Sequence, residues 1–426
     1  MTEMQERDYV RDFDLDDPYF ANHFGEVTSD LQGTCPVVHS NALGGYKVVV
    51  SDEAIREVAA NWRLFSNRFG YEPNRNGDDN ARLYPLEIDP PYQSSWRSVI
   101  GPYLSPKAIA NREDSIRAHV NDLLDDFIED GSCDFVDKFA AHLPGRVFFS
   151  TFLQVPLSDL PAIQEATDDA VRNPIRPGDT PETYAARRQA GWNRVGEFLD
   201  TYMTMRENEP PRGDFVDAIM RGVVTENGEE APRKHKLFVM IDMLAGGMTT
   251  TTFLLAGVAQ YLATNPEGAR RLAEDPSLHP QAVEEFARYY ASILALGRTA
   301  LEDTVVEGEP VKKGDMLMLA YSMGCRDPRV FENPNVVDID RKVTGNLAFG
   351  YGPHRCPGNH IAKLQARVTL KELLRRLPDI KIAPVGESKV SHSTVTRNWD
   401  TLPITFTPGP RGHKGITPRH LPSDQH

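Results

Sequence analysis

Three glycines and two prolines surround one cysteine in the stretch Phe349-Gly350-Tyr351-Gly352-Pro353-His354-Arg355-Cys356-Pro357-Gly358. Glycine allows tight turns and close backbone approaches that other residues resist. A helix is predicted to begin directly afterwards, over residues 359–374, and the unpaired N–H groups at its start would stabilise a thiolate. The loop is therefore suited to hold the sulfur of Cys356 as an axial ligand of a metal macrocycle. The alternative is a structural cysteine, since free cysteines commonly behave as small buried hydrophobes.

The composition is that of a soluble globular protein, with 40% hydrophobic and 25% charged residues among 426. Residues 1–17 are rich in Asp and Glu, which argues against a secretory leader or an N-terminal membrane anchor. A net charge of −14 argues against nucleic acid or an anionic membrane as the main partner. The four cysteines show neither disulfide nor zinc spacing, which favours a reducing compartment and hence the cytoplasm: Cys35, Cys133, Cys325 and Cys356.

The chain is predicted to be mostly helical from Ser94 onward, with Pro and Gly marking the helix ends. Two short strands are predicted before that point, over residues 36–40 and 46–51, separated by the hairpin signal Gly44-Gly45. The segment 173–180 is either a mobile lid or a plain surface turn. Further helices are predicted over residues 113–129, 135–153, 157–172 and 182–207.

The most apolar long stretch covers residues 237–263, which is long enough to cross a bilayer. It contains Asp242, Gln260 and four consecutive threonines, so a buried helix of a soluble protein is the better interpretation. Ala245-Gly246-Gly247 in its centre is poor helix-forming material. Residues this small allow a flat group to lie against the backbone, and the threonine hydroxyls beside them would bring water to the site.

The spacing F-x-x-G-x-x-x-C-x-G of residues 349–358 resembles the haem-binding loop of the cytochrome P450 family. The E-x-x-R of Glu285 and Arg288, whose charges share one face of a predicted helix, resembles a second motif of that family. Between the two, Asp327-Pro328-Arg329-Val330-Phe331 to Asp340-Arg341 resembles the family's D-P-x-x-F segment. The resemblance implies that Glu285, Arg288 and Arg341 form a buried structural network.

The resemblance also implies a mainly α fold with a small β-rich part near the N-terminus. Haem b would lie between the helix predicted over residues 237–263 and the helix after the cysteine loop, with the Cys356 thiolate as its iron ligand. One catalytic domain would cover residues 31–407. It would follow an N-terminal extension of residues 1–30 and precede a polar C-terminal tail of residues 408–426, which is expected to be flexible.

Haem carries two propionates, so cationic or hydrogen-bond-donating side chains are expected to converge on one edge of it. By resemblance these are Arg298, His354, and Arg97 at the end of an H-x-x-x-R motif. Gln93 replaces the histidine that opens this motif in the family, and it keeps an amide donor. Taken singly, each is typical of a surface polar residue; their shared order along the chain favours the haem. The other positions expected against the haem are Phe349, Gly350 and Gly246.

The family usually has A/G-G-x-D/E-T in its central helix, where an acid and an alcohol organise water for proton delivery. In one register of this chain, Thr249 occupies the acid position and Thr250 the alcohol position; in the other, Met248 and Thr249 do. The first register keeps the family's spacing to Asn265-Pro266-Glu267 and is preferred. A carboxylate is missing in both, so protons would come through threonine-ordered water, another acid or the substrate. The alternative is that these threonines only cap helix carbonyls.

The substrate pocket is expected to be apolar, which favours a terpenoid, aromatic or alicyclic substrate. Arg68, Arg172 or Arg176 would instead orient a substrate carboxylate. Each apolar candidate is equally typical of ordinary core packing. The expected pocket residues are Ile293, Leu294, Ala295 and Leu296 before Arg298, Phe69 and Tyr71 in an early loop, and Val395 and Thr396 in a late turn.

The implied reaction inserts one oxygen atom from O2 into a small hydrophobic substrate. Its electrons would come from NAD(P)H through a separate reductase and a separate ferredoxin, because the sequence shows no flavin or iron–sulfur segment. Two alternatives stay open: peroxide-driven or atypical chemistry, because the distal acid is replaced, and a haem-binding sensor without turnover. The basic residues near the cysteine loop are either a docking site for the ferredoxin or a solvated helix face: Arg355, Lys363, Arg367 and Lys371.

Overall fold

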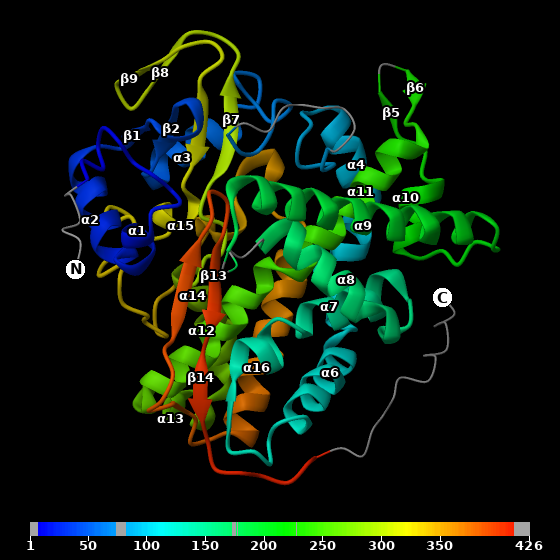
Figure 1. Ribbon diagram of the computed structural model, residues 1–426, viewed down its shortest axis with the longest axis vertical. Helices are drawn as coiled ribbons and strands as arrows, with labels where there is room; N and C mark the ends of the chain where they lie inside the picture. The colour runs from blue at the N-terminus through cyan, green and yellow to red at the C-terminus, as the bar shows by residue number, and fades with distance from the viewer. Residues whose placement is uncertain (1–6, 74–81, 173–175, 177, 227, 413–426) are drawn as a thin grey trace.

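The computed structural model describes residues 7–73, 82–172, 176, 178–226 and 228–412. Most helices gather on one side of the molecule, and the main β-sheet and the N-terminal helices lie on the other (Figure 1). The α-helices are α1 (Pro18–Asn22), α2 (Phe24–Thr34), α3 (Asp52–Ala60), α4 (Tyr92–Leu104), α5 (Pro106–Ala110), α6 (Glu113–Asp125), α7 (Leu143–Phe148), α8 (Leu160–Thr167), α9 (Pro181–Glu207), α10 (Phe215–Arg221), α11 (Arg233–Met248), α12 (Thr250–Thr264), α13 (Pro266–Glu274), α14 (His279–Tyr289), α15 (Tyr321–Gly324) and α16 (Asn359–Arg376). The strands are β1 (Val37–Ser40), β2 (Tyr46–Val49), β3 (Phe65–Ser66), β4 (Ser132–Asp134), β5 (Thr225–Glu226), β6 (Glu229–Glu230), β7 (Leu296–Ala300), β8 (Thr304–Val306), β9 (Glu309–Val311), β10 (Met316–Leu319), β11 (Lys381–Ile382), β12 (Lys389–His392), β13 (Arg397–Thr401) and β14 (Pro403–Thr405).

The main sheet has five strands in the order β1-β2-β10-β7-β3. The hairpin expected from the sequence is confirmed: β1 and β2 pair antiparallel, with Ser40 opposite Tyr46. Gly44 and Gly45 between them have φ angles of 89° and 92°, which residues with a side chain rarely adopt. β10 continues the sheet parallel to β2 and antiparallel to β7, and β7 brings Arg298 to the wall of the cavity described below.

The helices predicted over residues 113–129, 182–207 and 359–374 correspond to α6, α9 and α16. Two other predictions were wrong in continuity, because several short helical turns replace each helix. Residues 135–153 form a π-helical turn, α7 and a second π-helical turn, and residues 157–172 form α8 between a 3₁₀ turn and a π turn. Pro144 and Pro161 stand in the first turns of α7 and α8. Proline lacks an N–H to continue a preceding helix but suits the start of a new one.

The central helix is also interrupted, because α11 and α12 meet at Thr249. Thr249 and Thr250 donate hydrogen bonds to the carbonyls of Ala245 and Gly246, at 3.4 and 2.9 Å. Such bonds to the carbonyl four residues back bend helices, and neighbouring glycines weaken them further. In the described part of the chain, α11 with α12 is the one helix long and apolar enough to cross a membrane, and 61% of its most apolar window is buried within the protein. Core helices of soluble proteins meet the same criterion.

The boundary expected at residue 31 does not separate the N-terminal helices from the core. Phe13, Phe20 and Phe24 are buried against Val48 and Met318 of the main sheet, so residues from 7 onward belong to the same packed body. Large aromatic side chains drive this packing because each removes much apolar surface from water. Residues 413–426 of the expected tail, and residues 173–175 and 177 of the expected lid or turn, lie outside the described residues.

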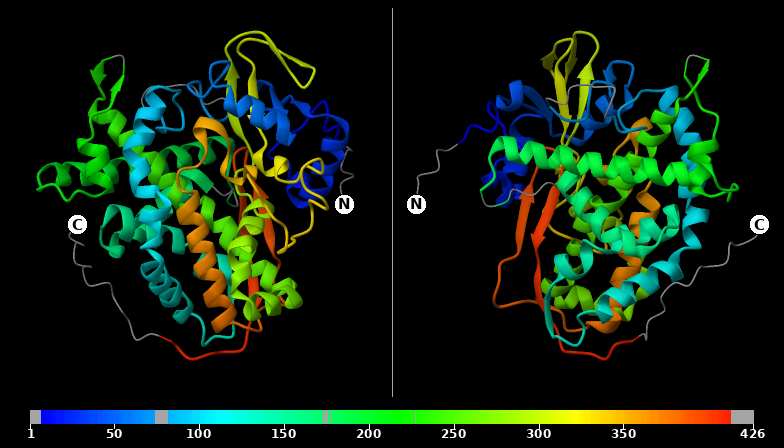
Figure 2. Two further views of the ribbon diagram at one scale, coloured as in Figure 1. Left: turned by 180° about the vertical axis from the view of Figure 1, so that it is seen from behind. Right: turned by 45° about the vertical axis from the view of Figure 1, so that its right-hand side comes forward.

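The helical side places the central helix opposite the helix that follows the cysteine loop. α12 packs against α16, and α16 packs in turn against α6 and α14 (Figure 2). These contacts bury Leu364, Val368 and Leu373 of α16 together with Leu255 and Val258 of α12 in the main apolar core. The ends of both helices therefore frame one interior space.

Candidate active site

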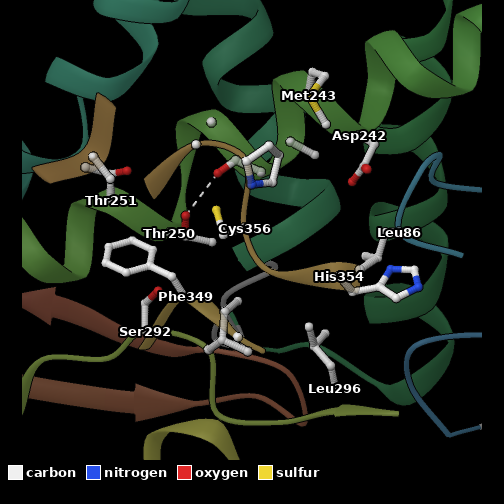
Figure 3. Close-up of a pocket in the computed structure, with 18 of the residues that line it drawn as sticks. Leu86, Asp242, Met243, Thr250, Thr251, Ser292, Leu296, Phe349, His354 and Cys356 are labelled. Carbon is white, nitrogen blue, oxygen red and sulfur yellow. Dashed lines mark hydrogen bonds between the residues drawn. The ribbon is translucent and has the colours of Figure 1, made fainter. Parts of the chain in front are cut away.

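The cysteine loop is held in a narrow turn immediately before α16. The Cys356 N–H donates to the carbonyl of Phe349 at 2.7 Å, and the Asn359 amide donates to the carbonyl of Cys356 at 3.0 Å. Gly350 has a φ angle of 70°, a conformation that a side chain would strain. The loop therefore presents the sulfur of Cys356 to an interior cavity (Figure 3).

The environment of Cys356 disfavours a free thiolate. Burial raises the pKa of the thiol, and the N–H of Gly358 and the charges of Arg97 and Arg355 only partly oppose this effect. The N–H groups at the helix start therefore stabilise the thiolate, as expected, but by less than burial destabilises it. A metal ion that binds the sulfur would supply the missing driving force for deprotonation, because metal ligation and proton loss are coupled.

The cavity lies between α11 and α12 on one side and the cysteine loop and α16 on the other. Gly246 opens onto it, since a Cβ atom there would meet no atom within 4 Å. Gly247 instead packs against Phe148, whose ring would lie 2.9 Å from an added Cβ. One glycine of the pair therefore leaves room for a flat group, as predicted, and the other allows α11 to approach α7. Phe349 and Gly350 line the opposite wall.

Nitrogen-rich side chains gather at one edge of the cavity. Arg298 is 1% exposed and donates to the carbonyl of Gly297 at 2.8 Å and to the Tyr321 hydroxyl at 3.4 Å. Arg97 donates to the carbonyl of Arg355 at 2.6 Å. Within the described residues, no ion pair joins Arg298 or Arg97 to a carboxylate.

His354 and Gln93 complete this edge. Nε2 of His354 is buried and has no hydrogen-bond partner among the described residues. Burial, and then the charges of Arg298 and Arg97, lower the pKa of His354 well below its usual value. The Gln93 amide donates to the carbonyl of Pro353 at 2.7 Å. Buried positive charge with an unsatisfied donor calls for an anion, and the two propionates of a haem fit this requirement.

Glu285, Arg288 and Arg341 form a buried network, as the sequence predicts. The side chains of Glu285 and Arg288 are 0% exposed and paired at 2.7 Å, and Arg341 reaches the same carboxylate at 3.3 Å. Arg288 also donates to the carbonyls of Cys325 and Pro334, both at 2.8 Å. The network therefore ties α14 to the segment that leads into the cysteine loop.

The threonines of the central helix divide between the cavity and the core. Thr250 lines the cavity and donates to the carbonyl of Gly246 (Figure 3). Thr251 lines it as well, which the sequence did not indicate. Thr249 and Met248 are buried and do not line it. Only the preferred register therefore brings its alcohol to the cavity wall, and the acid position, Thr249, faces away in this structure.

Some of the residues expected in the substrate pocket line the cavity and others do not. Ile293, Leu296, Val395 and Thr396 line the cavity. The prediction was wrong for Leu294 and Ala295, which are 0% exposed and pack in the core between the N-terminal helices and the main sheet.

Phe69 was likewise misplaced, since it is 48% exposed and does not line the cavity. Tyr71, which was expected in the pocket together with Phe69, does line the cavity. The proposed carboxylate-binding arginines Arg68 and Arg176 pair with Asp89 and Asp169 instead.

Several lining residues come from segments that the sequence did not mark. Phe148 is the last residue of α7, Phe152 lies in the π-helical turn that follows, and Trp192 lies on α9. Leu86 comes from the loop before α4. Asp242 lies in the wall formed by α11. Asp242 precedes Gly246 by four residues and Thr250 by eight, so all three lie on one face of the helix. This spacing could have revealed Asp242 from the sequence.

Comparisons with known proteins indicate the same family as the sequence motifs. Residues 180–394 match the family model "Cytochrome P450". Cytochrome P450-terp of a Pseudomonas species is 31% identical over 81% of this chain and 84% of its own length. Vitamin D3 dihydroxylase of Streptomyces griseolus is 30% identical over 84% of this chain and 87% of its own length. The crystal structure of cytochrome P450 CYP101C1 superposes with a TM-score of 0.81 at 26% identity, covering 93% of this chain and 97% of that one.

The chain belongs to the cytochrome P450 family, and its enzyme class is that of the P450 monooxygenases, oxidoreductases that incorporate oxygen from O2. The predicted family, the mainly α fold and the enzyme class are thereby confirmed.

Proposed function

We propose that this enzyme inserts one oxygen atom from O2 into a small hydrophobic substrate held in the cavity beside Cys356. The convergence of Cys356, the cationic edge formed by Arg298 and Arg97, and the open Gly246–Thr250 wall on one cavity carries the proposal. When bound, haem b would supply the oxidation chemistry. Cys356 would ligate its iron, and the propionates would be held by Arg298, Arg97, His354 and Gln93.

The substrate class is proposed from the cavity wall. Apolar side chains dominate it, among them Phe152, Leu254, Ile293 and Leu296, which favours a terpenoid, aromatic or alicyclic compound. Two relatives, vitamin D3 dihydroxylase and the steroid C26-monooxygenase of Mycolicibacterium smegmatis, are named for hydrophobic compounds. We place the enzyme in the cytoplasm, since its cysteine usage suits a reducing compartment.

The absorption spectrum of the dithionite-reduced protein with carbon monoxide tests the proposal. Thiolate ligation by Cys356 is expected to produce the strongly red-shifted Soret band after which the family is named. A band typical of histidine-ligated haem, or failure to retain haem, would reject the assignment of Cys356. Substrate-dependent NADH consumption with an oxygenated product would then exclude a sensor without turnover.

Thr250 is proposed to hold water and move protons at the cavity wall, where its hydroxyl lies beside the Gly246 carbonyl. Thr250→Ala is expected to lower product formed per NADH by roughly tenfold or more, the scale of losing a proton-transfer group. The remaining electrons should appear as hydrogen peroxide or water. Thr249→Ala is the matched control, because Thr249 does not line the cavity, and its yield should stay near wild type. Equal yields in wild type and Thr250→Ala would contradict the role.

Peroxide-driven turnover is the second candidate, and the threonine at the acid position favours it. If this chemistry applies, product should form faster with hydrogen peroxide alone than with O2, NADH and a ferredoxin system. Thr249→Asp tests whether the missing acid limits the O2-driven reaction. If this variant forms more product per NADH, proton supply limits the natural enzyme.

A separate ferredoxin, reduced by an NAD(P)H-dependent reductase, is the proposed electron donor, docking near the cysteine loop. The basic cluster there is largely neutralised, because Lys363 pairs with Glu284 at 2.7 Å, and Arg367 and Lys371 pair with Glu113 at 2.9 and 3.1 Å. Arg355 is exposed and makes no ion pair among the described residues, so it is best placed to contact an acidic partner.

Arg355→Glu is therefore expected to weaken ferredoxin binding about tenfold and to flatten the salt dependence of reduction. Lys363→Glu should act more weakly, since Lys363 must leave Glu284 to contact a partner. Stopped-flow reduction at several salt concentrations measures both. If the rate of reduction by ferredoxin is unchanged in Arg355→Glu, the ferredoxin does not dock on this surface.

A further inference from the structure

Asp242 places a carboxylate in the wall of an otherwise apolar part of the cavity. It projects from α11 next to Met243, and Leu86 lies on the same side of the cavity (Figure 3). An ionised carboxylate is a strong hydrogen-bond acceptor, and its bonds to donors strengthen where water is scarce. At this position it faces the space that a substrate would fill.

The helix sets the distance from Asp242 to the oxidation site. Asp242, Gly246 and Thr250 are four residues apart and all line the cavity, so they form one row along the central helix. Eight residues at about 1.5 Å each separate the ends of this row by about 12 Å. A skeleton bound to Asp242 at one end would therefore extend along this row toward Thr250.

We propose that Asp242 binds a hydrogen-bond donor of the substrate, a hydroxyl or a cationic nitrogen group, and so determines which end of the skeleton reaches the oxidation site. The inference rests on the proposed function and narrows its substrate class to elongated hydrophobic compounds with a donor at one end. The donor and the oxidised carbon would then lie at opposite ends of the molecule.

Arg97 is a charged neighbour of Asp242 and offers a competing explanation for this carboxylate. Burial lowers the pKa of Arg97, and the charges of Cys356 and Asp242 oppose that shift, so Asp242 acts on it electrostatically. If balancing Arg97 were the only role of Asp242, its loss would weaken haem retention and leave substrate selectivity unchanged. The two roles therefore predict different measurements.

Rigid biphenyl probes in matched pairs test the proposal, with dissociation constants measured by calorimetry on the haem-loaded enzyme. 4-Hydroxymethylbiphenyl is compared with 4-ethylbiphenyl, and biphenyl-4-carboxamidine, which is cationic, with 4-isopropylbiphenyl. For each pair, the preference for the donor probe is expected to fall about 10- to 100-fold in Asp242→Leu, as expected for a hydrogen bond to a charged group. Met243→Leu, a change in the neighbouring wall residue, should leave both preferences near wild type.

Asp242→Asn distinguishes the two donor chemistries, because it keeps an acceptor and removes the charge. If Asp242 acts as a hydrogen-bond acceptor, the alcohol preference should survive in Asp242→Asn. If its charge also contributes to binding, the amidine preference should fall in Asp242→Asn toward the value measured in Asp242→Leu. Unchanged preferences in Asp242→Leu, with or without loss of haem, would overturn the proposal. The red-shifted carbon monoxide band is scored on the same samples, so failure of the haem-thiolate function is seen separately from failure of the Asp242 site.

Discussion

Replacing Cys356 by histidine is expected to move the Soret band of the reduced carbon monoxide complex to the position typical of histidine-ligated haem. Oxidation of any substrate should fall by roughly 10³-fold or more, the scale on which removal of a group acting directly in the chemistry is felt. The reason is electronic: a thiolate donates electron density that favours O–O cleavage, and imidazole donates less. Spectra and single-turnover product yields measure the two effects.

Cys133→Ser serves as the control for the cysteine substitution. Cys133 is a half-buried free cysteine on β4 and does not line the cavity. Its spectrum and activity should match wild type, which would show that the loss in Cys356→His is specific. A red-shifted band that persisted in Cys356→His would mean that another residue ligates the iron.

Replacing Glu285 by glutamine is expected to have the largest effect on stability. The change removes one charge of a fully buried pair and leaves Arg288 uncompensated, which typically costs about 3–5 kcal/mol of unfolding free energy. Arg341 and the backbone N–H of Asp338 lose the same partner, so the segment before the cysteine loop should loosen as well. Denaturant unfolding of the haem-loaded protein and its haem content measure these losses.

The chain contains a matched control for this substitution. Glu267 and Arg270 have the same three-residue spacing on α13 and pair at 2.7 Å, but their side chains are exposed. Glu267→Gln should leave stability unchanged within error, because exposed pairs contribute little. Similar losses in Glu267→Gln and Glu285→Gln would show that burial of the Glu285–Arg288 pair is not what makes it important.

The local patterns in the sequence were reliable where a residue's role depends on its near neighbours. The glycines around Cys356, the pairing of Glu285 with Arg288, and the Gly44–Gly45 turn all follow from backbone freedom or helix spacing. Helix continuity was less reliable. Pro144 and Pro161 are helix breaks that can be recognised in the sequence. The interruption at Thr249 depends instead on hydrogen bonds from the hydroxyls of Thr249 and Thr250 to helix carbonyls, which the sequence does not predict.

The cavity wall was the least predictable part, since it is assembled from elements distant in the chain. Nothing local distinguishes Ile293, which lines the cavity, from Leu294, which is buried beside it. The direction of each side chain is set by how its segment packs on the sheet. The same is true of Trp192, which reaches the cavity from α9.

By itself the sequence determined the family and the residues proposed for the centre of the site: a cysteine in a glycine-rich loop before a helix, and charged residues that follow the family's order along the chain. The tertiary structure decided which of these groups meet and what surrounds them. It brought Arg298, Arg97 and His354 together at one edge, turned Thr249 away, and placed Asp242 in the cavity wall. The proposed iron ligand can be read from residues that are neighbours in the sequence. Substrate selection depends on a cavity wall that forms only when distant segments pack against one another.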